Sequence, residues 1–241
     1  MIDAEAIAAR LARMRARIDA AARRAGRSGD DVRIVAVTKK LGLDAVRAAY
    51  AAGQREFGEN YVQEATAKID ALADEMPDAR WHLIGRLQSN KAAVGVRSFA
   101  LLHGVDSMST VAALSRAADR SARRVDVLLQ IRLGERGADG AAAKSDAGVR
   151  GGIETSAADA FLKQAWTYDR VRFVGLMGVA DPDLPARPQF AALRQLAKHL
   201  AGLGLANEPI KDLSMGMTDD FEDAVAEGAT IVRIGTAIFG E

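Results

Sequence analysis

The segment VRIVAVTKKLGLDAVRAAYAAGQREFGE, residues 32–59, contains the repeating unit from which the fold can be inferred. It begins with an apolar run of strand-forming residues (32–38), continues with an Ala-rich stretch of helical period (43–52), and ends with a second short strand-like run (55–59). A helix between two strands is the usual connection of parallel strands. The segment therefore predicts a parallel β–α–β unit.

The same unit recurs along the rest of the chain. Further strand-like runs are predicted at 80–85, 99–105, 125–133, 171–178, 212–216 and 230–235, and helical stretches at 61–73, 109–122, 156–166, 189–203 and 219–227. Eight strands alternating with helices in 241 residues match one (β/α)8 TIM barrel. A doubly wound open sheet is the main alternative, but no GxGxxG motif follows the first strand. We predict an α/β protein with a single (β/α)8 barrel domain over residues 1–241.

Two segments lie outside this repeat. In residues 1–28, Ile7, Leu11, Met14 and Ile18 recur at helical spacing, so we expect an extra N-terminal helix packed on the barrel. Residues 134–152 are rich in Gly and Ala without a clear period, and they predict a long mobile loop after the fifth strand.

The composition excludes several classes of function. A net charge of +1 provides no overall field that would select nucleic acid or an acidic membrane surface. The absence of cysteine excludes disulfides and thiolate chemistry, and it fits a reducing compartment. The three histidines occur without an HExxH motif, which argues against a transition-metal site. No apolar run approaches the roughly 20 residues that span a bilayer. We therefore expect a cytoplasmic protein without a bound metal.

Lys39 and Lys40 end the first strand, and one of them is a candidate for chemistry. Because side chains alternate along a strand, Val35, Val37 and Lys39 face one way, while Thr38 and Lys40 face the other. Lysines at strand ends commonly extend their ammonium groups into water. A lysine held in the mouth of a barrel is instead partly desolvated, and its neutral amine can form a Schiff base with a carbonyl. The alternation separates the two lysines without choosing between them.

Arg233 interrupts the last apolar strand. Ile231, Arg233 and Gly235 share one face of this strand, and Val232 and Ile234 share the other. A guanidinium cannot lose its proton to escape burial, so it needs a partner. The partner is either a carboxylate in an internal ion pair or a bound ligand.

Two strand ends carry the small residues that an anion site requires. Gly235 and Thr236 follow the eighth strand, and the segment LSMGMT (213–218) places Ser214 and Gly216 at the seventh. A glycine allows close approach of the backbone, whose N–H groups can bind phosphate. TIM barrels commonly bind phosphate with the loops after strands seven and eight. These residues favour a phosphorylated ligand held by an amine, although 213–218 also fits a plain turn before a helix.

Six segments together resemble one known family. They are VAVTK (35–39), GQREFGENYVQEA (53–65), WHLIGRLQSNK (81–91), GLM (175–177), LSMGMTDDFEDAVAEGAT (213–230) and VRIGTAIFG (232–240). In this order they resemble the pyridoxal 5′-phosphate (PLP) homeostasis proteins, the YggS/PROSC family, whose barrel is similar to the N-terminal domain of alanine racemase.

The resemblance implies PLP as the cofactor and assigns roles to individual residues. The lysine that closes the AV[ST]K strand would hold PLP as an aldimine, which selects Lys39 over Lys40, and Arg233 would face the pyridine nitrogen. Asn60 and His82 would lie at the edge of the cofactor. The backbone of Ser214, Met215 and Gly216, together with that of Gly235 and Thr236, would bind the phosphate.

The expected function is that of a PLP carrier in intracellular PLP homeostasis, with no residue assigned a catalytic role. A guanidinium at the ring nitrogen keeps that nitrogen unprotonated, so PLP would be a weak electron sink. Racemases of this type use a further C-terminal domain, whereas this sequence ends at Glu241. The expected partners are PLP, amino acids and PLP-requiring apo-enzymes. No exposed apolar stripe indicates an oligomer, so a monomer is expected. The alternatives are a racemase-like PLP enzyme of low activity and a PLP-independent Schiff-base lyase of the aldolase type.

Overall fold

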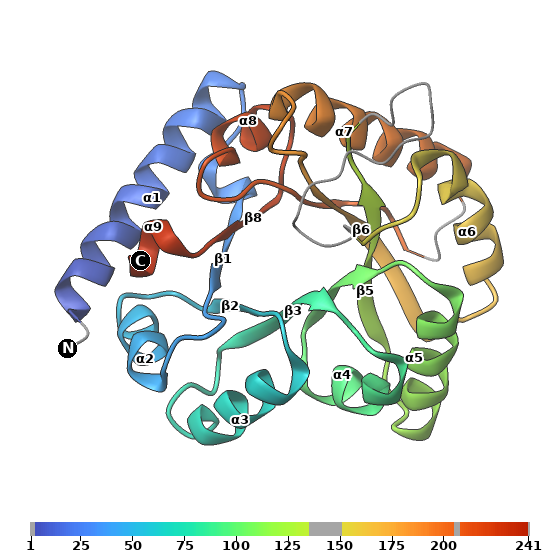
Figure 1. Ribbon diagram of the computed structural model, residues 1–241, viewed down its shortest axis with the longest axis horizontal. Coiled ribbons are helices and arrows are strands. Elements are labelled where there is room, and N and C mark those ends of the chain that lie inside the picture. The colour runs from blue at the N-terminus through green and yellow to red at the C-terminus, as the bar shows by residue number, and fades with distance from the viewer. Residues whose placement is uncertain (1–2, 135–150, 205–207, 241) are drawn as a thin grey trace.

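The eight predicted strands form a closed barrel, drawn in Figure 1 with its surrounding helices. The computed structural model describes residues 3–134, 151–204 and 208–240. All neighbouring strands are parallel, and the barrel closes where the first strand pairs with the eighth. The strands are β1 (Arg33–Val37), β2 (Glu56–Glu59), β3 (Arg80–Arg86), β4 (Leu101–Val105), β5 (Val125–Arg132), β6 (Val171–Val179), β7 (Asp212–Ser214) and β8 (Ile231–Ile234). The prediction of a (β/α)8 barrel is confirmed.

Helices cover the outside of the barrel. The helices are α1 (Ala4–Arg24), α2 (Leu43–Ala51), α3 (Val62–Leu72), α4 (Ala92–Ser98), α5 (Met108–Arg120), α6 (Ala158–Ala165), α7 (Ala186–Leu203), α8 (Phe221–Ala226) and α9 (Thr236–Phe239), with 3-10 turns at Gly29–Asp31, Ser89–Lys91 and Thr155–Ala157. Two of them, α4 and α9, were not predicted. The four residues of α9 are too few for a helical period to show, and α4 (AAVGVRS) contains Val94, Gly95 and Val96, which are weak helix formers.

The N-terminal helix α1 is also confirmed. It lies along α8 and α9, so that both ends of the chain meet on one side of the barrel (Figure 1). Its residues Ile7, Leu11, Met14 and Ile18 are buried, as their spacing predicts. The predicted loop 134–152 falls largely on residues 135–150, which lie outside the described residues.

Successive side chains along each barrel strand point alternately into two apolar environments. Side chains that point outward, such as Ala36 and Ile234, join the large core between the strands and the helices. Inward-pointing apolar side chains form a separate small cluster of Val35, Leu101, Leu128, Met177 and Ile231. The alternation fixes which residues of each strand reach the barrel interior and its mouth.

Among the described residues, no helix combines the length and the apolar character needed to cross a membrane.

Candidate functional site

Lys39 lies two residues after β1, at the carboxyl end of the barrel. Val35 lies in the inner cluster, and Arg33, two residues earlier, bonds to Asp212 across the barrel. The N–H of Thr38 still donates to the carbonyl of Gly58 at 3.0 Å, so strand pairing extends to the residue before Lys39. The N–H of Leu41 then donates back to the Thr38 carbonyl at 3.0 Å, which makes Lys39 and Lys40 the two central residues of a turn. The placement of Lys39 in the mouth stays a prediction.

Lys40 does not continue the strand. Its backbone has a φ of 62°, a left-handed conformation that turns the chain away from β1. Both Lys39 and Lys40 are exposed. The strand alternation that the sequence predicts for the two lysines therefore does not apply to them, because the strand ends at Val37 and both lysines belong to the turn that follows.

A cluster between the barrel and α3 holds the backbone on both sides of Lys39. Lys68 donates from Nζ to the Thr38 carbonyl at 2.7 Å and to Oε1 of both Glu59 and Glu64 at 2.8 Å. Oε1 of Glu64 also accepts the N–H of Lys40 at 2.6 Å, and the Thr38 hydroxyl donates to Glu59 at 2.6 Å. We call Glu59, Glu64 and Lys68 the Lys68 cluster.

The Lys68 cluster contains a carboxylate that depends on its cation. Glu59 is fully buried, and among the described residues its Oε2 has no hydrogen-bond partner. Burial raises the pKa of Glu59, and the hydrogen bonds from Lys68 and Thr38 offset only part of this effect. The three protons of the Lys68 ammonium are all used in these hydrogen bonds, so this lysine has a structural role.

Lys68 is a residue that sequence reasoning missed. It is buried on the face of α3 that also buries Val62, Ala65 and Leu72. A lysine at apolar spacing was the available signal, because such a residue must find a buried partner.

Arg233 is buried inside the barrel with neutral hydrogen-bond partners. Its Nη1 donates to Ser214 Oγ at 2.6 Å, and its Nη2 donates to the Gly178 carbonyl at 3.0 Å. The internal ion pair that we considered as an alternative does not form, since no carboxylate of the described residues lies within 4.0 Å of the guanidinium. Burial lowers the pKa of Arg233 to about 10, although the nearby Asp220 acts in the opposite direction. The guanidinium stays charged at neutral pH and is available to a ligand.

The loops after β7 and β8 meet at the mouth. The hydroxyls of Thr218 and Thr236 lie 3.2 Å apart, one from each loop. Gly216 has a φ of +93°, and Gly235 precedes the first residue of α9. The first N–H groups of a helix have no partner within it. This region therefore has the small residues, hydroxyls and backbone donors that can receive a phosphate.

The predicted phosphate residues are not equivalent in the structure. Ser214 belongs to β7 and points into the barrel interior, and the N–H of Met215 donates to the Ile231 carbonyl at 3.1 Å. Gly216 lies two residues beyond the end of β7, in the loop that follows this strand. A phosphate contact stays a prediction for all three, and it stays one for Gly235 and Thr236 as well.

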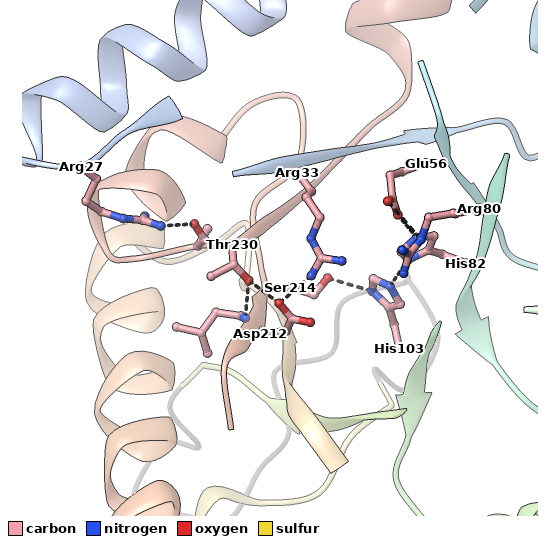
Figure 2. A network of polar contacts seen from close by, with 11 residues as sticks. Arg27, Arg33, Glu56, Arg80, His82, His103, Asp212, Ser214 and Thr230 are labelled. Carbon is pink, nitrogen blue, oxygen red and sulfur yellow. Dashed lines mark hydrogen bonds and ion pairs between the residues drawn. The ribbon is translucent and has the colours of Figure 1, made fainter. Parts of the chain in front are cut away.

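Asn60 and His82 occupy different places. Asn60 borders a surface cavity of about 500 Å³ that also receives Arg86 and Lys91. A Cβ at Gly85 would lie 2.3 Å from the Asn60 carbonyl oxygen, so this approach requires glycine. His82 is fully buried, with both ring nitrogens bonded inside the barrel to Glu56 and His103 (Figure 2). Its direct contact with a cofactor stays a prediction.

The structure is thus a (β/α)8 barrel with a lysine after its first strand, a buried arginine in its last strand and small residues in the loops after β7 and β8. A family model described as the N-terminal domain of alanine racemase matches residues 9–241. The chain is also 38% identical to a pyridoxal phosphate homeostasis protein of Escherichia coli (strain K12) over 235 residues, which are 97% of this chain and 96% of that protein.

A second relative of the same name, from Pseudomonas aeruginosa, is 39% identical over 234 residues, 97% of this chain and 95% of the relative. Among solved structures, PipY of Synechococcus elongatus with PLP bound is 37% identical, with a TM-score of 0.80, and the match covers 97% of this chain and 100% of that one. The chain belongs to the family of pyridoxal phosphate homeostasis proteins.

Proposed function

We propose that this protein binds PLP through a Schiff base with Lys39 and serves as a carrier in PLP homeostasis, without strong catalytic activity. The observation that supports this most directly is the buried guanidinium of Arg233, whose hydrogen-bond partners among the described residues are neutral and whose barrel carries Lys39 just after its first strand. The PLP bound to PipY, at 37% identity, supports the same cofactor.

The residues present fit PLP. Arg233 would face the pyridine nitrogen, and the region of Gly216, Gly235 and Thr236 would receive the phosphate. PLP supplies an aldehyde that condenses with a primary amine, with loss of water, and can pass to another amine. The Lys68 cluster would hold Lys39 in place by fixing its two neighbours in the chain.

The charge of Arg233 favours a carrier over a strong catalyst. Because the guanidinium remains protonated, it disfavours a proton on a pyridine nitrogen placed beside it. An unprotonated ring withdraws electrons weakly, so carbanion chemistry would be slow. The same proposal includes a monomeric, cytoplasmic protein that exchanges PLP with free amino acids or apo-enzymes. The cavity beside Asn60 is lined by Arg86 and Lys91, whose positive charges would attract the carboxylate group of an amino acid.

The proposal is tested by trapping the cofactor. The purified protein incubated with PLP should turn yellow, lose this colour on treatment with borohydride, and yield a pyridoxyl adduct on the peptide that contains Lys39. The Lys39→Ala variant should lack the adduct, whereas Lys40→Ala should retain it. A wild-type protein that stays colourless with PLP would contradict the proposal and favour a Schiff-base lyase of the aldolase type.

Turnover separates a carrier from an enzyme. Amino-acid racemisation by the PLP-loaded protein should be far below ordinary enzyme rates of roughly 1–1000 per second. Racemisation in that range that is lost in Lys39→Ala would instead establish a PLP-dependent racemase. Arg233→Ala should change the absorption of bound PLP and weaken its retention, and an unchanged spectrum would place Arg233 away from the ring.

A further inference from the structure

A chain of polar side chains runs through the barrel interior and ends at Arg233. Figure 2 shows Glu56, His82, His103 and Ser214 pointing toward one another from four different strands. His82 bonds to Glu56 through Nε2 and to His103 through Nδ1, at 2.9 Å. His103 Nδ1 lies 2.9 Å from Ser214 Oγ, which accepts Nη1 of Arg233 at 2.6 Å. We call these five residues the interior chain.

One end of the interior chain reaches solvent. His82, His103 and Ser214 are fully buried, whereas the Glu56 side chain is 17% exposed. Glu56 borders a cavity of about 360 Å³ at the amino ends of β1 and β2, opposite the mouth. The interior chain therefore connects this cavity with the guanidinium of Arg233.

Charged groups from five strands surround the two histidines. Burial raises the pKa of Glu56, but its hydrogen bond with His82 and the nearby charges outweigh burial, so the pKa lies below its ordinary value. Burial and the nearby positive charges hold the pKa of His103 well below its usual range. The charged groups around the two histidines are Arg33 of β1, Glu56 of β2, Arg80 of β3, Asp212 of β7 and Arg233 of β8, and Asp212 pairs with Arg33.

The number of available protons determines which atom donates in each hydrogen bond of the interior chain. A neutral imidazole has one N–H, and an ionised carboxylate only accepts. With Glu56 ionised, His82 must donate from Nε2, so its Nδ1 accepts the Nε2–H of His103. The Nδ1 of His103 then accepts the hydroxyl proton of Ser214, and Ser214 Oγ is left to accept from Arg233. Every hydrogen bond of the interior chain is satisfied with one proton each.

The opposite direction leaves a buried proton without a partner. If His82 carries a second proton, its Nδ1 donates to His103, whose Nδ1–H then donates to Ser214. Ser214 Oγ would receive two donors, and its own proton would find no acceptor among the described residues. A buried unsatisfied hydroxyl is costly, so the direction toward Glu56 is favoured.

We propose that Glu56, His82 and His103 are positioning residues for Arg233: they draw the hydroxyl proton of Ser214 away from the guanidinium and keep Ser214 Oγ as its acceptor. The dipole of the hydroxyl then stabilises the cation and fixes the plane of the guanidinium. One proton added at the Glu56 end reverses the interior chain without moving heavy atoms, and it presents Arg233 with a competing donor. The consequence for ligand affinity rests on the proposed function, whereas the direction of the interior chain does not.

The direction is measured in the wild-type protein without PLP. The sequence has three histidines, and the exposed His199 is an internal reference, identified in a His199→Gln variant. Long-range ¹H–¹⁵N correlation spectra near pH 7.5 should show His82 and His103 as neutral Nε2–H tautomers. A charged His103, or a proton on its Nδ1, would overturn the proposal, and this measurement needs no variant of the interior chain.

Glu56→Gln tests the effect at a distance. The amide can donate to His82 Nε2, which permits the reversed direction without an added proton. Glu75→Gln is the matched control, since in the part of the chain that the structure describes Glu75 pairs with the surface residue Arg47 and with no group of the interior chain. In Glu56→Gln the tautomers should mix, and the dissociation constant for PLP should rise about fivefold relative to the control.

The outcomes distinguish this inference from the proposed function. If Glu56→Gln matches Glu75→Gln in both tautomers and PLP affinity, or in affinity alone, the positioning role is refuted. If the wild-type protein binds no PLP, the proposed function fails, and the tautomers still decide the direction of the interior chain.

Discussion

Replacing Lys68 by Met should destabilise the protein strongly, because among the described residues Lys68 is the only cation bonded to the buried Glu59. The side chains have similar volume, so the change deletes the charge and three hydrogen bonds while packing is largely kept. Breaking a buried pair by removing one partner costs about 3–5 kcal/mol, since the other charge is left uncompensated. We expect a loss of this size in the free energy of unfolding near pH 8.

The stability lost in Lys68→Met should depend on pH, and the pKa of Glu59 determines whether it grows or shrinks as pH rises. Burial already raises the pKa of Glu59, and removal of Lys68 raises it further. The folded state then keeps a proton on Glu59 that the unfolded state releases near its ordinary carboxyl pKa, so stability is highest at low pH and falls as pH rises through the folded pKa. The slope is at most about 1.4 kcal/mol per pH unit, and the loss should therefore be smaller near pH 5 than near pH 8.

Denaturant unfolding at several pH values provides the assay. Lys163→Met, on the exposed face of α6, is the matched control and should change stability by about 0.5 kcal/mol or less. The double variant Lys68→Met/Glu59→Gln should recover part of the loss and flatten its pH dependence. A Lys68→Met protein within about 1 kcal/mol of wild type at pH 8 would refute the reasoning. Such a result would mean that Glu59 finds another partner or water.

Three further predictions concern single sites. Gly216→Ala should cost about 1–3 kcal/mol in unfolding experiments, because position 216 has a φ of +93° and the new Cβ would lie 2.6 Å from that of Ala224; a wild-type midpoint would contradict this. Gly85→Ala should displace the Asn60 carbonyl, which would lie 2.3 Å from the new Cβ, and should weaken PLP retention; unchanged retention would separate Asn60 from the site. Glu222→Gln removes an exposed pair with two arginines of α1 and should cost about 1 kcal/mol or less, with no difference in high salt; a larger loss would indicate a stronger link between α1 and α8.

Local patterns in the sequence were sufficient for the barrel. Each strand and each long helix has its own periodicity, and eight alternations in one chain leave few architectures. The helices α4 and α9 were missed because their local patterns are weak: α9 has only four residues, and α4 contains Gly95 between two valines. The face that Arg233 shares with Ile231 was also predictable, because alternation along β8 needs only the residues of that strand, and closure of the barrel turns this face inward.

The partners of these residues depended on the closed barrel. Glu56, His82, His103 and Ser214 come from β2, β3, β4 and β7, and nothing in their sequence spacing shows that their side chains meet. Their contacts depend on the register between parallel strands, which the tilt of the strands sets around the whole barrel.

The two lysines after the first strand show the same division. The sequence by itself determined that Lys39 and Lys40 follow the first strand, because the apolar run of that strand is a local property of the chain; only the structure showed that both lie in a turn, in which Lys40 has a φ of 62°. Only the tertiary structure decided what holds Lys39 in place, since the Lys68 cluster joins β1, β2 and α3. Only closure of the barrel gave the buried Arg233 a hydroxyl and a carbonyl as partners in place of a carboxylate. Ion pairs and hydrogen bonds between residues that are distant in the sequence form only when the chain folds, so the sequence alone does not show them.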